Sequence, residues 1–171
     1  MKALGSYYRI SLSRGREVIT VAEEIDVVKN YMSIQQVRYG DIFTMHYDID
    51  ENSTRHKILK LILQPLVENS LYHGIKPKGE KGNIYIRCRQ YDQYIELAVE
   101  DDGVGTDRET ISMVLDNRYD ADAKPSFGLR GTIERLRIFY GLKDPVSIKS
   151  TLGVGTTVTI RIPIKKEERN G

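Results

Sequence analysis

The sequence predicts an α+β sandwich, in which helices cover one face of a mostly antiparallel sheet. Three observations lead to this fold class. Residues 20–40 and 127–141 carry the 3.6-residue apolar period of amphipathic helices. Residues 82–101 and 145–164 each contain two alternating segments joined by a short turn, as in a β-hairpin. Helices and strands that occur in runs, with several hairpins, are typical of layered α+β folds.

The N-terminal elements are predicted from capping residues and periodicity. Thr20 is a suitable N-cap, acidic residues follow it in the first turn, and Gly40 is a suitable helix end. Residues 42–49 alternate like a strand. Residues 57–75, KILKLILQPLVENSLYHGI, are predicted as one long helix that must tolerate Pro65, which removes a backbone hydrogen bond or kinks the helix.

The two hairpins are predicted to bury one face of each strand, since their apolar residues alternate. In the first hairpin the inward residues are Ile84, Ile86, Cys88, Ile95, Leu97 and Val99. The second hairpin turns at the sequence LGVG. The helix before it, residues 127–141, places Ile133, Leu136 and Tyr140 on one side.

Composition limits the class of protein. A chain of 171 residues, with 40% hydrophobic and 29% charged residues, is expected to form one globular domain. A net charge of +2 gives no electrostatic reason to expect a nucleic-acid or membrane surface. The one cysteine, Cys88, excludes an internal disulfide and a cysteine-based zinc site. There is no apolar run of the ~18–20 residues that a membrane span requires, so we expect a soluble, intracellular-type domain.

The connection over residues 101–126 is unusually long for a compact domain, and such connections are often lids or binding loops. It opens with a segment that contains Gly103 and Gly105, and Gly128 follows it. Glycine permits positive φ and close approach of a ligand, so this bracketed segment is predicted to be a lid, with residues 106–125 poorly ordered without a ligand.

Four short motifs occur in order: ENSLYH at 68–73, EDDGVG at 100–105, SFGLRG at 126–131 and GVGTT at 153–157. Together they resemble the N, G1, G2 and G3 boxes of the GHKL ATPases. Residues 17–164 are most similar to sensor histidine kinases of the LytS/YesM type. The resemblance implies the GHKL (Bergerat) fold with an ATP lid, binding of ATP and Mg²⁺, and transfer of the γ-phosphoryl group to a histidine.

The first motif lies on the predicted long helix. Asn69, Tyr72, His73 and Lys76 are spaced as one stripe of an α-helix. The amide oxygen of Asn69 is a suitable Mg²⁺ ligand, and His73 and Lys76 would then face the phosphate chain. The resemblance implies that Glu68 is the catalytic acid that polarises the attacking imidazole. By composition alone, a solvated helix face is an equal alternative.

The second and fourth motifs are assigned to the adenine. The resemblance implies that Asp101 accepts a hydrogen bond from the adenine amine, where a guanine carbonyl would be repelled. Gly103 and Gly105 would let the base lie against the backbone, and Thr156 would help to hold Asp101. Asp102 stands where the family commonly has Asn. Taken singly, these motifs also fit ordinary turns.

The third motif begins a helix whose free N–H groups can hold phosphate oxygens. Its predicted nucleotide-binding residues are Phe127, Gly128, Leu129 and Arg130. Ser126 replaces the first glycine of the usual motif, and Gly131 stands where related kinases often have Asn. We therefore expect these two differences from the family motif to affect lid closure and nucleotide affinity. An ordinary glycine at a helix start is the alternative.

Some expected features are missing. The sequence contains no GxxxxGK[ST] motif, which excludes a P-loop. His46, His56 and His73 do not stand in a phosphoacceptor setting such as NPHFLFN. We therefore interpret residues 1–16 as the remnant of an upstream helical or dimerisation connection. Residues 17–166 are predicted to be the GHKL ATP-binding catalytic domain, and residues 167–171 a tail.

The resemblance implies a longer parent protein, dimeric and anchored in the cell membrane, with this domain in the cytoplasm. Its partners would be the parent's phosphoacceptor helical domain and a downstream response regulator, with no nucleic acid and no direct membrane contact. The isolated chain should then be inactive in autophosphorylation. Alternatives are a stand-alone GHKL ATPase, an anti-sigma-type serine kinase, a plain scaffold, and a regulatory ATP-binding (pseudokinase) module, which Ser126 favours.

Overall fold

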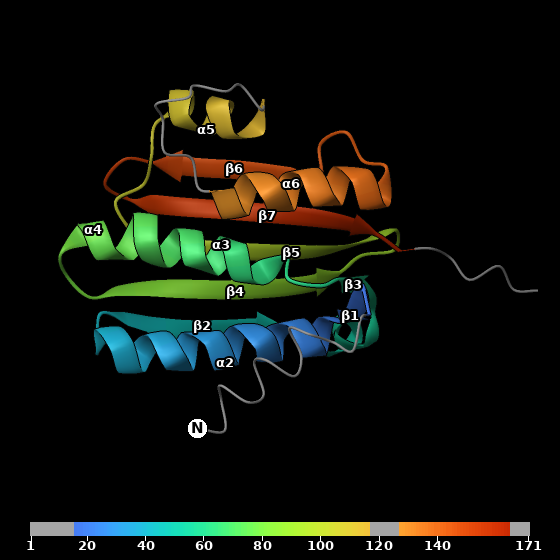
Figure 1. Cartoon of the computed structure of the whole chain (residues 1–171), viewed down its shortest axis with the longest axis horizontal. Helices are drawn as coiled ribbons and strands as arrows, with labels where there is room; N and C mark the ends of the chain where they lie inside the picture. Colours follow the sequence, from blue (N-terminus) through green and yellow to red (C-terminus); the bar gives the residue numbers. More distant parts are fainter. Residues whose placement is uncertain (1–15, 117–126, 165–171) are drawn as a thin grey trace, which may run out of the picture.

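The computed structural model describes residues 16–116 and 127–164, and a five-stranded sheet is its central feature (Figure 1). The strand order is β2-β4-β5-β7-β6, in which β2 and β4 are parallel and the other neighbours are antiparallel. The strands are β2 (Phe43–Ile49), β4 (Gly82–Gln90), β5 (Tyr94–Asp101), β6 (Val146–Thr151) and β7 (Gly155–Pro163). The mostly antiparallel sheet predicted from the sequence is confirmed, as are both hairpins.

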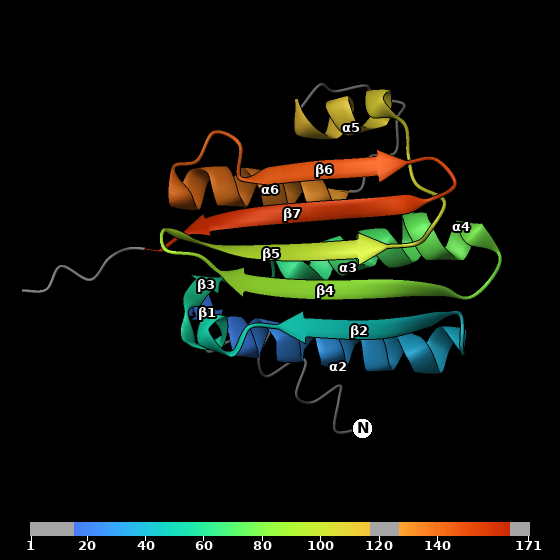
Figure 2. The ribbon, with the colours of Figure 1, turned by 180° about the vertical axis from the view of Figure 1, so that it is seen from behind.

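Helices cover one face of this sheet and leave the other open, as the view from behind makes clear (Figure 2). The covering helices are α2 (Val21–Tyr39), α3 (Leu63–Asn69) with its continuation, and α6 (Phe127–Tyr140). The short helix α5 (Arg108–Leu115) lies beside the edge strand β6. The predicted α+β sandwich is therefore confirmed. No helix in the described part of the chain has the length and hydrophobicity needed to cross a bilayer.

Helix α2 begins and ends as its sequence predicts. The Thr20 hydroxyl accepts a hydrogen bond from the Glu23 backbone N–H at 3.2 Å, and the Glu23 carboxylate accepts one from the Thr20 N–H at 2.8 Å. This reciprocal capping box satisfies two N–H groups that the helix itself leaves unpaired. Gly40, with φ of 70°, ends the helix.

The prediction of one helix over residues 57–75 is wrong at its start. Lys57–Leu59 form the short strand β3, which pairs with β1 (Val18–Thr20), and a 3₁₀-helix at Glu51–Arg55 precedes it. Helix α3 begins only at Leu63. Pro65 therefore lies in the first helical turn, where its missing N–H would have had no helical partner. The proline therefore costs the helix no backbone hydrogen bond.

The same helix then changes its winding. Ser70–Ile75 form a π-helical segment, and Lys76–Lys78 form the short helix α4 before Gly79, whose φ is 75°. A π-helical turn holds more residues than an α-helical turn, so side chains beyond it no longer follow the 3.6-residue spacing. This change divides the stripe predicted around Asn69.

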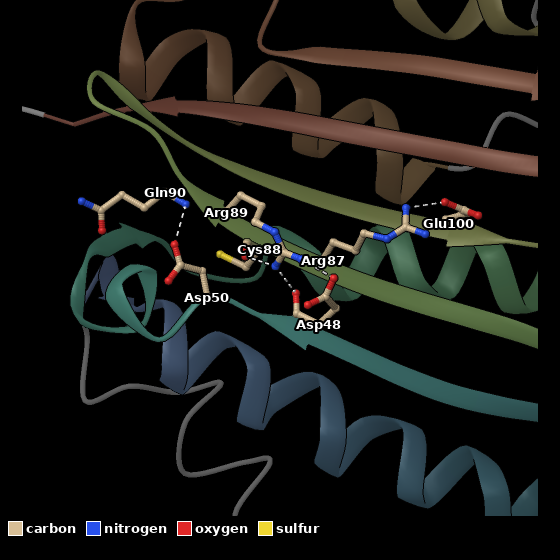
Figure 3. A network of polar contacts seen from close by, with 7 residues as sticks. All are labelled: Asp48, Asp50, Arg87, Cys88, Arg89, Gln90 and Glu100. Atoms are coloured by element: carbon tan, nitrogen blue, oxygen red, sulfur yellow. Dashed lines mark hydrogen bonds and ion pairs between the residues drawn. The ribbon is translucent and has the colours of Figure 1, made fainter.

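The core lies between the helices and the covered face of the sheet. The predicted inward residues of the first hairpin are all 2% exposed or less, and Ile133 and Leu136 of α6 pack against the same cluster. On the open face, several charged side chains pair with each other. Figure 3 shows part of this network, in which Arg87 contacts Glu100 and Arg89 contacts Asp48.

Candidate nucleotide-binding site

A cavity of about 290 Å³ lies between the helices and the ends of strands β5, β6 and β7. Its lining comes from four parts of the chain that are distant in sequence: Asn69, His73 and Gly74; Asp101, Gly105, Thr106, Thr110, Ile111 and Val114; Leu129; and Ile148, Thr156 and Val158. Each of the four predicted motifs therefore contributes at least one residue to this cavity. The α5 residues Thr110, Ile111 and Val114 also line the cavity, and no motif in the sequence predicted them.

Asp101 is the buried carboxylate of this cavity. Only 4% of its surface is exposed, and its Oδ1 accepts a hydrogen bond from the Gly103 N–H at 3.0 Å. Burial raises the pKa of Asp101, and hydrogen bonds from the Ser70 hydroxyl and from the backbone N–H groups of Gly103 and Thr156 act against that rise. The cavity thus contains a carboxylate that is costly to bury and has acceptor capacity for a ligand.

Thr156 lies opposite Asp101 in the ladder between β5 and β7. Its hydroxyl forms a hydrogen bond with the Ser150 hydroxyl at 2.8 Å, and Ser150 also accepts one from the Thr106 N–H at 2.8 Å. The Thr156 side chain is therefore tied to β6 and to the loop after β5, while its backbone contacts Asp101. Thr156 was predicted to help to hold Asp101, and the contact between them is made by the Thr156 backbone N–H rather than by its hydroxyl.

Gly74 is a residue of the site that sequence reasoning missed. A Cβ atom at Gly74 would lie 2.6 Å from the Asp101 Oδ1, and one at Gly103 would lie 2.3 Å from the Gly74 carbonyl carbon. Both glycines are needed because the helix and the loop after β5 pack backbone to backbone. The available signal was a glycine inside a predicted helix, which usually has a packing reason.

Asp102 faces the opposite side of the strand end. Its two carboxylate oxygens accept hydrogen bonds from the Asn83 backbone N–H and side-chain amide, both at 2.8 Å, and Lys78 lies 3.4 Å away. Partial burial acts to raise the pKa of Asp102, but the Asn83 hydrogen bonds and the Lys78 charge outweigh it and lower that pKa. Asp102 therefore joins the end of β5 to the start of β4.

The structure brings together only part of the predicted helical stripe. Asn69 and His73 line the cavity. Lys76 does not: its Nζ lies 4.4 Å from the ring centre of Tyr39 and 4.9 Å from that of Tyr72. The π-helical segment turns Tyr72 and Lys76 toward the C-terminal end of α2.

Glu68 is also outside the cavity lining and lies on the α2 side of its helix. Its carboxylate accepts a hydrogen bond from the Gln64 side-chain amide at 2.8 Å. Burial, and then the nearby negative charge of Glu68, raise the pKa of Tyr31 on α2. Glu68 is thus held in a polar cluster beside the cavity rather than within it.

Helix α6 supplies Leu129 to the cavity, where this side chain is 3% exposed. Phe127 begins α6, and Gly128, the second residue of this helix, is exposed. The guanidinium of Arg130 donates a hydrogen bond to the Met113 carbonyl of α5 at 3.1 Å. The Arg130 side chain is therefore bonded to α5, and its predicted role in phosphate binding stays a prediction.

The first part of the predicted lid is helical. Asp107 caps α5 by accepting a hydrogen bond from the Thr110 N–H at 2.8 Å. At the other end, Arg137 of α6 donates to the Leu115 carbonyl at 2.9 Å, a favourable position for a cation at a helix C-terminus. The rest of the predicted lid, residues 117–126 with Ser126, lies outside the described residues.

Comparison with known families identifies this arrangement. The sequence pattern of the "Histidine kinase-, DNA gyrase B-, and HSP90-like ATPase" family matches residues 54–166, which contain the four motifs and the whole cavity. The chain belongs to this ATPase family. A second pattern, described as "Histidine kinase", matches residues 1–43.

Sensor kinases are among the relatives of this ATPase-family chain. Sensor histidine kinase YpdA of Escherichia coli K12 is 34% identical over 161 residues, which make up 94% of this chain and 27% of YpdA. Sensor histidine kinase YesM of Bacillus subtilis 168 is 29% identical over 167 residues, 98% of this chain and 28% of YesM. Sensor protein LytS of Staphylococcus haemolyticus is 29% identical over 94% of this chain. The chain thus spans 27% to 28% of the length of these curated relatives, and its similarity to the LytS/YesM type is confirmed.

Solved structures agree on the fold. The catalytic domain of histidine kinase ThkA gives a TM-score of 0.67 at 17% identity, covering 86% of this chain and 98% of that domain. The histidine kinase domain of the blue-light activated kinase from Erythrobacter litoralis EL346 gives 0.59 at 18% identity, covering 95% of this chain and 71% of the other. The predicted histidine-kinase ATPase fold is therefore confirmed.

Proposed function

We propose that this chain binds Mg-ATP and, within its parent protein, delivers the γ-phosphoryl group to a histidine on a separate helical domain. The observation that carries the proposal is the buried Asp101 carboxylate, which lies in one cavity with Asn69 and His73. Membership of the ATPase family supports ATP as the ligand.

The Asp101 side of the cavity suits adenine. The carboxylate accepts a hydrogen bond from an exocyclic amine, whereas the carbonyl at the same position of guanine would be repelled. Leu129, Ile148 and Val158 supply apolar walls for a flat base. Gly103 and Gly105 then act by allowing the loop to pack closely, since a Cβ at Gly105 would lie 2.1 Å from the Thr151 carbonyl oxygen.

The Asn69 side suits the metal and the phosphates. Mg²⁺ in nucleotide sites usually takes one or two protein oxygens and completes its shell with phosphates and water. The single Asn69 amide fits that donor set, and no cluster of three or more metal-ligating His, Cys, Asp or Glu side chains occurs among the described residues. The first turn of α6, at Gly128, offers backbone N–H groups to phosphate oxygens. The predicted contact of Lys76 with the phosphates lacks support, because its ammonium group lies over the rings of Tyr39 and Tyr72.

Phosphoryl transfer depends mainly on positioning and charge stabilisation. Glu68 lies one residue before Asn69 but outside the cavity, so its carboxylate can meet an imidazole that approaches from another domain. We assign it the role of polarising that imidazole. The family match over residues 1–43 and the sensor-kinase relatives support a phosphoacceptor domain upstream, a dimeric membrane-anchored parent and a response regulator as partners.

The test is calorimetry on the isolated chain with ATP, ADP and GTP, each with and without Mg²⁺. ATP and ADP should bind, GTP should bind at least ~10-fold more weakly, and Mg²⁺ should strengthen ATP binding. Asn69→Ala should remove the Mg²⁺-dependent part of ATP affinity and leave metal-free binding nearly unchanged. Absence of ATP binding would favour the scaffold alternative, and equal loss with and without Mg²⁺ would mean that Asn69 only braces the helix.

Transfer itself needs the parent's helical hairpin, added in trans with labelled ATP. The isolated chain should stay unlabelled, and the hairpin should gain acid-labile phosphohistidine. Glu68→Gln should lower this transfer by ~10²–10⁴ with little change in ATP affinity, because a polarising acid acts mainly in the transition state. Binding without transfer would favour the regulatory module, and stable phosphoserine on another protein would favour the serine-kinase alternative.

A further inference from the structure

The helix that carries Glu68, Asn69 and His73 begins at a turn capped from a distant helix. Glu24, in the first turn of α2, is fully buried. Its Oε2 accepts a hydrogen bond from the Leu61 N–H at 2.8 Å, and its Oε1 accepts from Ile62 and Leu63 at 2.8 and 2.9 Å. One carboxylate therefore satisfies three successive backbone donors.

This cap replaces the usual local one. A helix start is normally capped by the side chain of the N-cap residue, but that residue in α3 is Ile62, which has no side-chain acceptor. Leu61, just before it, has φ of 56°, a left-handed conformation that is unfavourable for a branched side chain. Such a conformation persists only where surrounding contacts impose it, and the Glu24 carboxylate is one of them.

Helix α6 holds the same turn from another side. Arg135 donates hydrogen bonds to the Leu61 carbonyl at 3.0 Å and to the Lys60 carbonyl at 2.7 Å, and the Tyr140 hydroxyl accepts one from the Leu59 N–H at 2.8 Å. The Lys60 N–H donates to the Glu17 carbonyl, next to β1, at 3.0 Å. The turn at residues 59–63 thus joins β1, α2 and α6.

The chemistry of the Glu24 site favours a carboxylate. Burial raises the pKa of Glu24, but the three N–H donors and the positive charge of Arg135 act against the rise. Both oxygens face donors, and the partial positive charge of a helix N-terminus stabilises an anion there. An uncharged amide at this position would direct an N–H group at a backbone N–H group.

The helix is fixed at two points. The Glu24 cap fixes its start, and the close contact of Gly74 with Asp101 and Gly103 fixes its far end. Asn69 lies between them, about 9 Å along the axis from Leu63 at 1.5 Å per residue. Loosening the start would therefore displace Asn69 and His73 more than it displaces Asp101.

We infer that Glu24 is a positioning residue: by capping α3 through Leu61, Ile62 and Leu63, it sets the metal- and phosphate-facing side of the cavity independently of the adenine-facing side. This inference deepens the proposed function and rests on it. A role in stability alone would weaken the two sides of the cavity equally or not at all.

The test compares Glu24→Gln with Val28→Ala, which truncates a fully buried apolar residue of the same helix and leaves the three hydrogen-bonding partners of the cap unchanged. In Glu24→Gln, the gain in ATP affinity that Mg²⁺ provides should fall by about tenfold, as expected for a misplaced ligand, while metal-free ADP affinity changes by less than about twofold. Val28→Ala should lower the unfolding midpoint and leave both affinities as in the wild type. Equal loss of both affinities in Glu24→Gln, or no loss, would overturn the inference.

A second pair of variants covers the case in which Glu24→Gln does not fold. Arg135→Met removes two hydrogen bonds from an exposed position and should shift the affinities in the same direction by a smaller factor. Leu61→Gly, which adopts positive φ without strain, should restore part of the Mg²⁺-dependent affinity when combined with Arg135→Met. No shift in Arg135→Met, or no recovery in the double variant, would count against the inference.

A readout without nucleotide separates this inference from the proposed function. NMR signals of the Asn69 side-chain amide and the His73 ring should move in Glu24→Gln, or in Arg135→Met, and stay in place in Val28→Ala. If the wild type binds no nucleotide but these signals move, the proposed function fails and the positioning role stands. Unmoved signals would overturn the positioning role whether or not nucleotide binds.

Discussion

Asp101, the last residue of β5, and Asp102, which follows it, are neighbours in sequence, yet the two faces of the sheet give them opposite surroundings. Asp101 is buried on the helix-covered face, where burial raises its pKa and the backbone N–H of Gly103 lies 3.0 Å from its Oδ1. Asp102 faces the other side, where Asn83 and Lys78 engage its oxygens and its pKa is lowered. A carboxylate whose oxygens are engaged by the protein serves the fold, whereas a buried one with acceptor capacity is suited to a ligand.

The same contrast extends over the whole sheet. On the covered face, polar side chains are few, and Glu24 and Asp101 are each held mainly by backbone groups. On the open face, charged side chains pair with each other, as in Arg87–Glu100 and Arg161–Glu96 (Figure 3 shows the first). Polar residues on the covered face are thus the better candidates for function.

The largest expected effect concerns Asp101 itself. Asp101→Asn should weaken ATP binding by about 1.5–3 kcal/mol, because a charge-assisted hydrogen bond to the adenine amine is lost. Asp102→Asn is the matched control, since its amide can still accept from Asn83, and it should leave ATP affinity within about twofold. Calorimetry measures both affinities, and circular dichroism checks that both variants keep the fold.

Binding of Asp101→Asn within twofold of the wild type would show that the adenine assignment is wrong. Equal losses in both variants would remove the functional distinction between the two faces at this strand end.

How far the sequence predicts the molecule depends on the range of the interactions. The hairpins at residues 82–101 and 145–164 were predictable because alternation and a local turn determine them. Strands β1 and β3 were not, because three-residue strands are stabilised by their distant pairing. The start of α3 depends on Glu24, which is 37 to 39 residues away from its partners, so no local pattern could locate it.

The site divides in the same way. The motifs led to Asn69, His73, Asp101 and Thr156 through their order along the chain, and the structure brings these residues to one cavity. Their roles stay predictions. The α-helical spacing placed Lys76 with them, but the π-helical segment turns it toward Tyr39, and such a change of winding has no signal in a 3.6-residue pattern. Gly74 was missed because its partner Asp101 is distant in sequence.

The next largest effect concerns stability: the unfolding free energies of the Asp101→Asn and Asp102→Asn variants should depend on pH with opposite signs. The raised pKa of Asp101 contributes stability that is present below its unfolded pKa of about 3.9 and is lost as pH rises through the folded pKa. The lowered pKa of Asp102 contributes stability that is present above about pH 3.9 and is lost as pH falls through the folded pKa. Relative to the wild type, Asp101→Asn should therefore gain unfolding free energy on going from pH 3 to pH 7, and Asp102→Asn should lose it.

Urea unfolding of the wild type and both variants at several pH values between 3 and 8 measures this difference. Curves for the two variants that change in the same direction would contradict the opposite surroundings of the two carboxylates.

The smallest expected effect is on the open face, and it tests whether that face behaves as solvated surface. Arg87 and Glu100 are 2.5 Å apart, but their side chains are 42% and 36% exposed, so water and salt screen their attraction. A double-mutant cycle with Arg87→Ala and Glu100→Ala should give a coupling of roughly 0.2–1 kcal/mol. That coupling should fall at high salt, and Arg161–Glu96, with exposures of 64% and 23%, serves as a second pair. A coupling above about 2 kcal/mol, or one that salt does not change, would mean that a partner or ligand environment rather than solvent sets the energetics of the open face. The open face would then need a function of its own, and the contrast between the two faces would no longer separate fold from function.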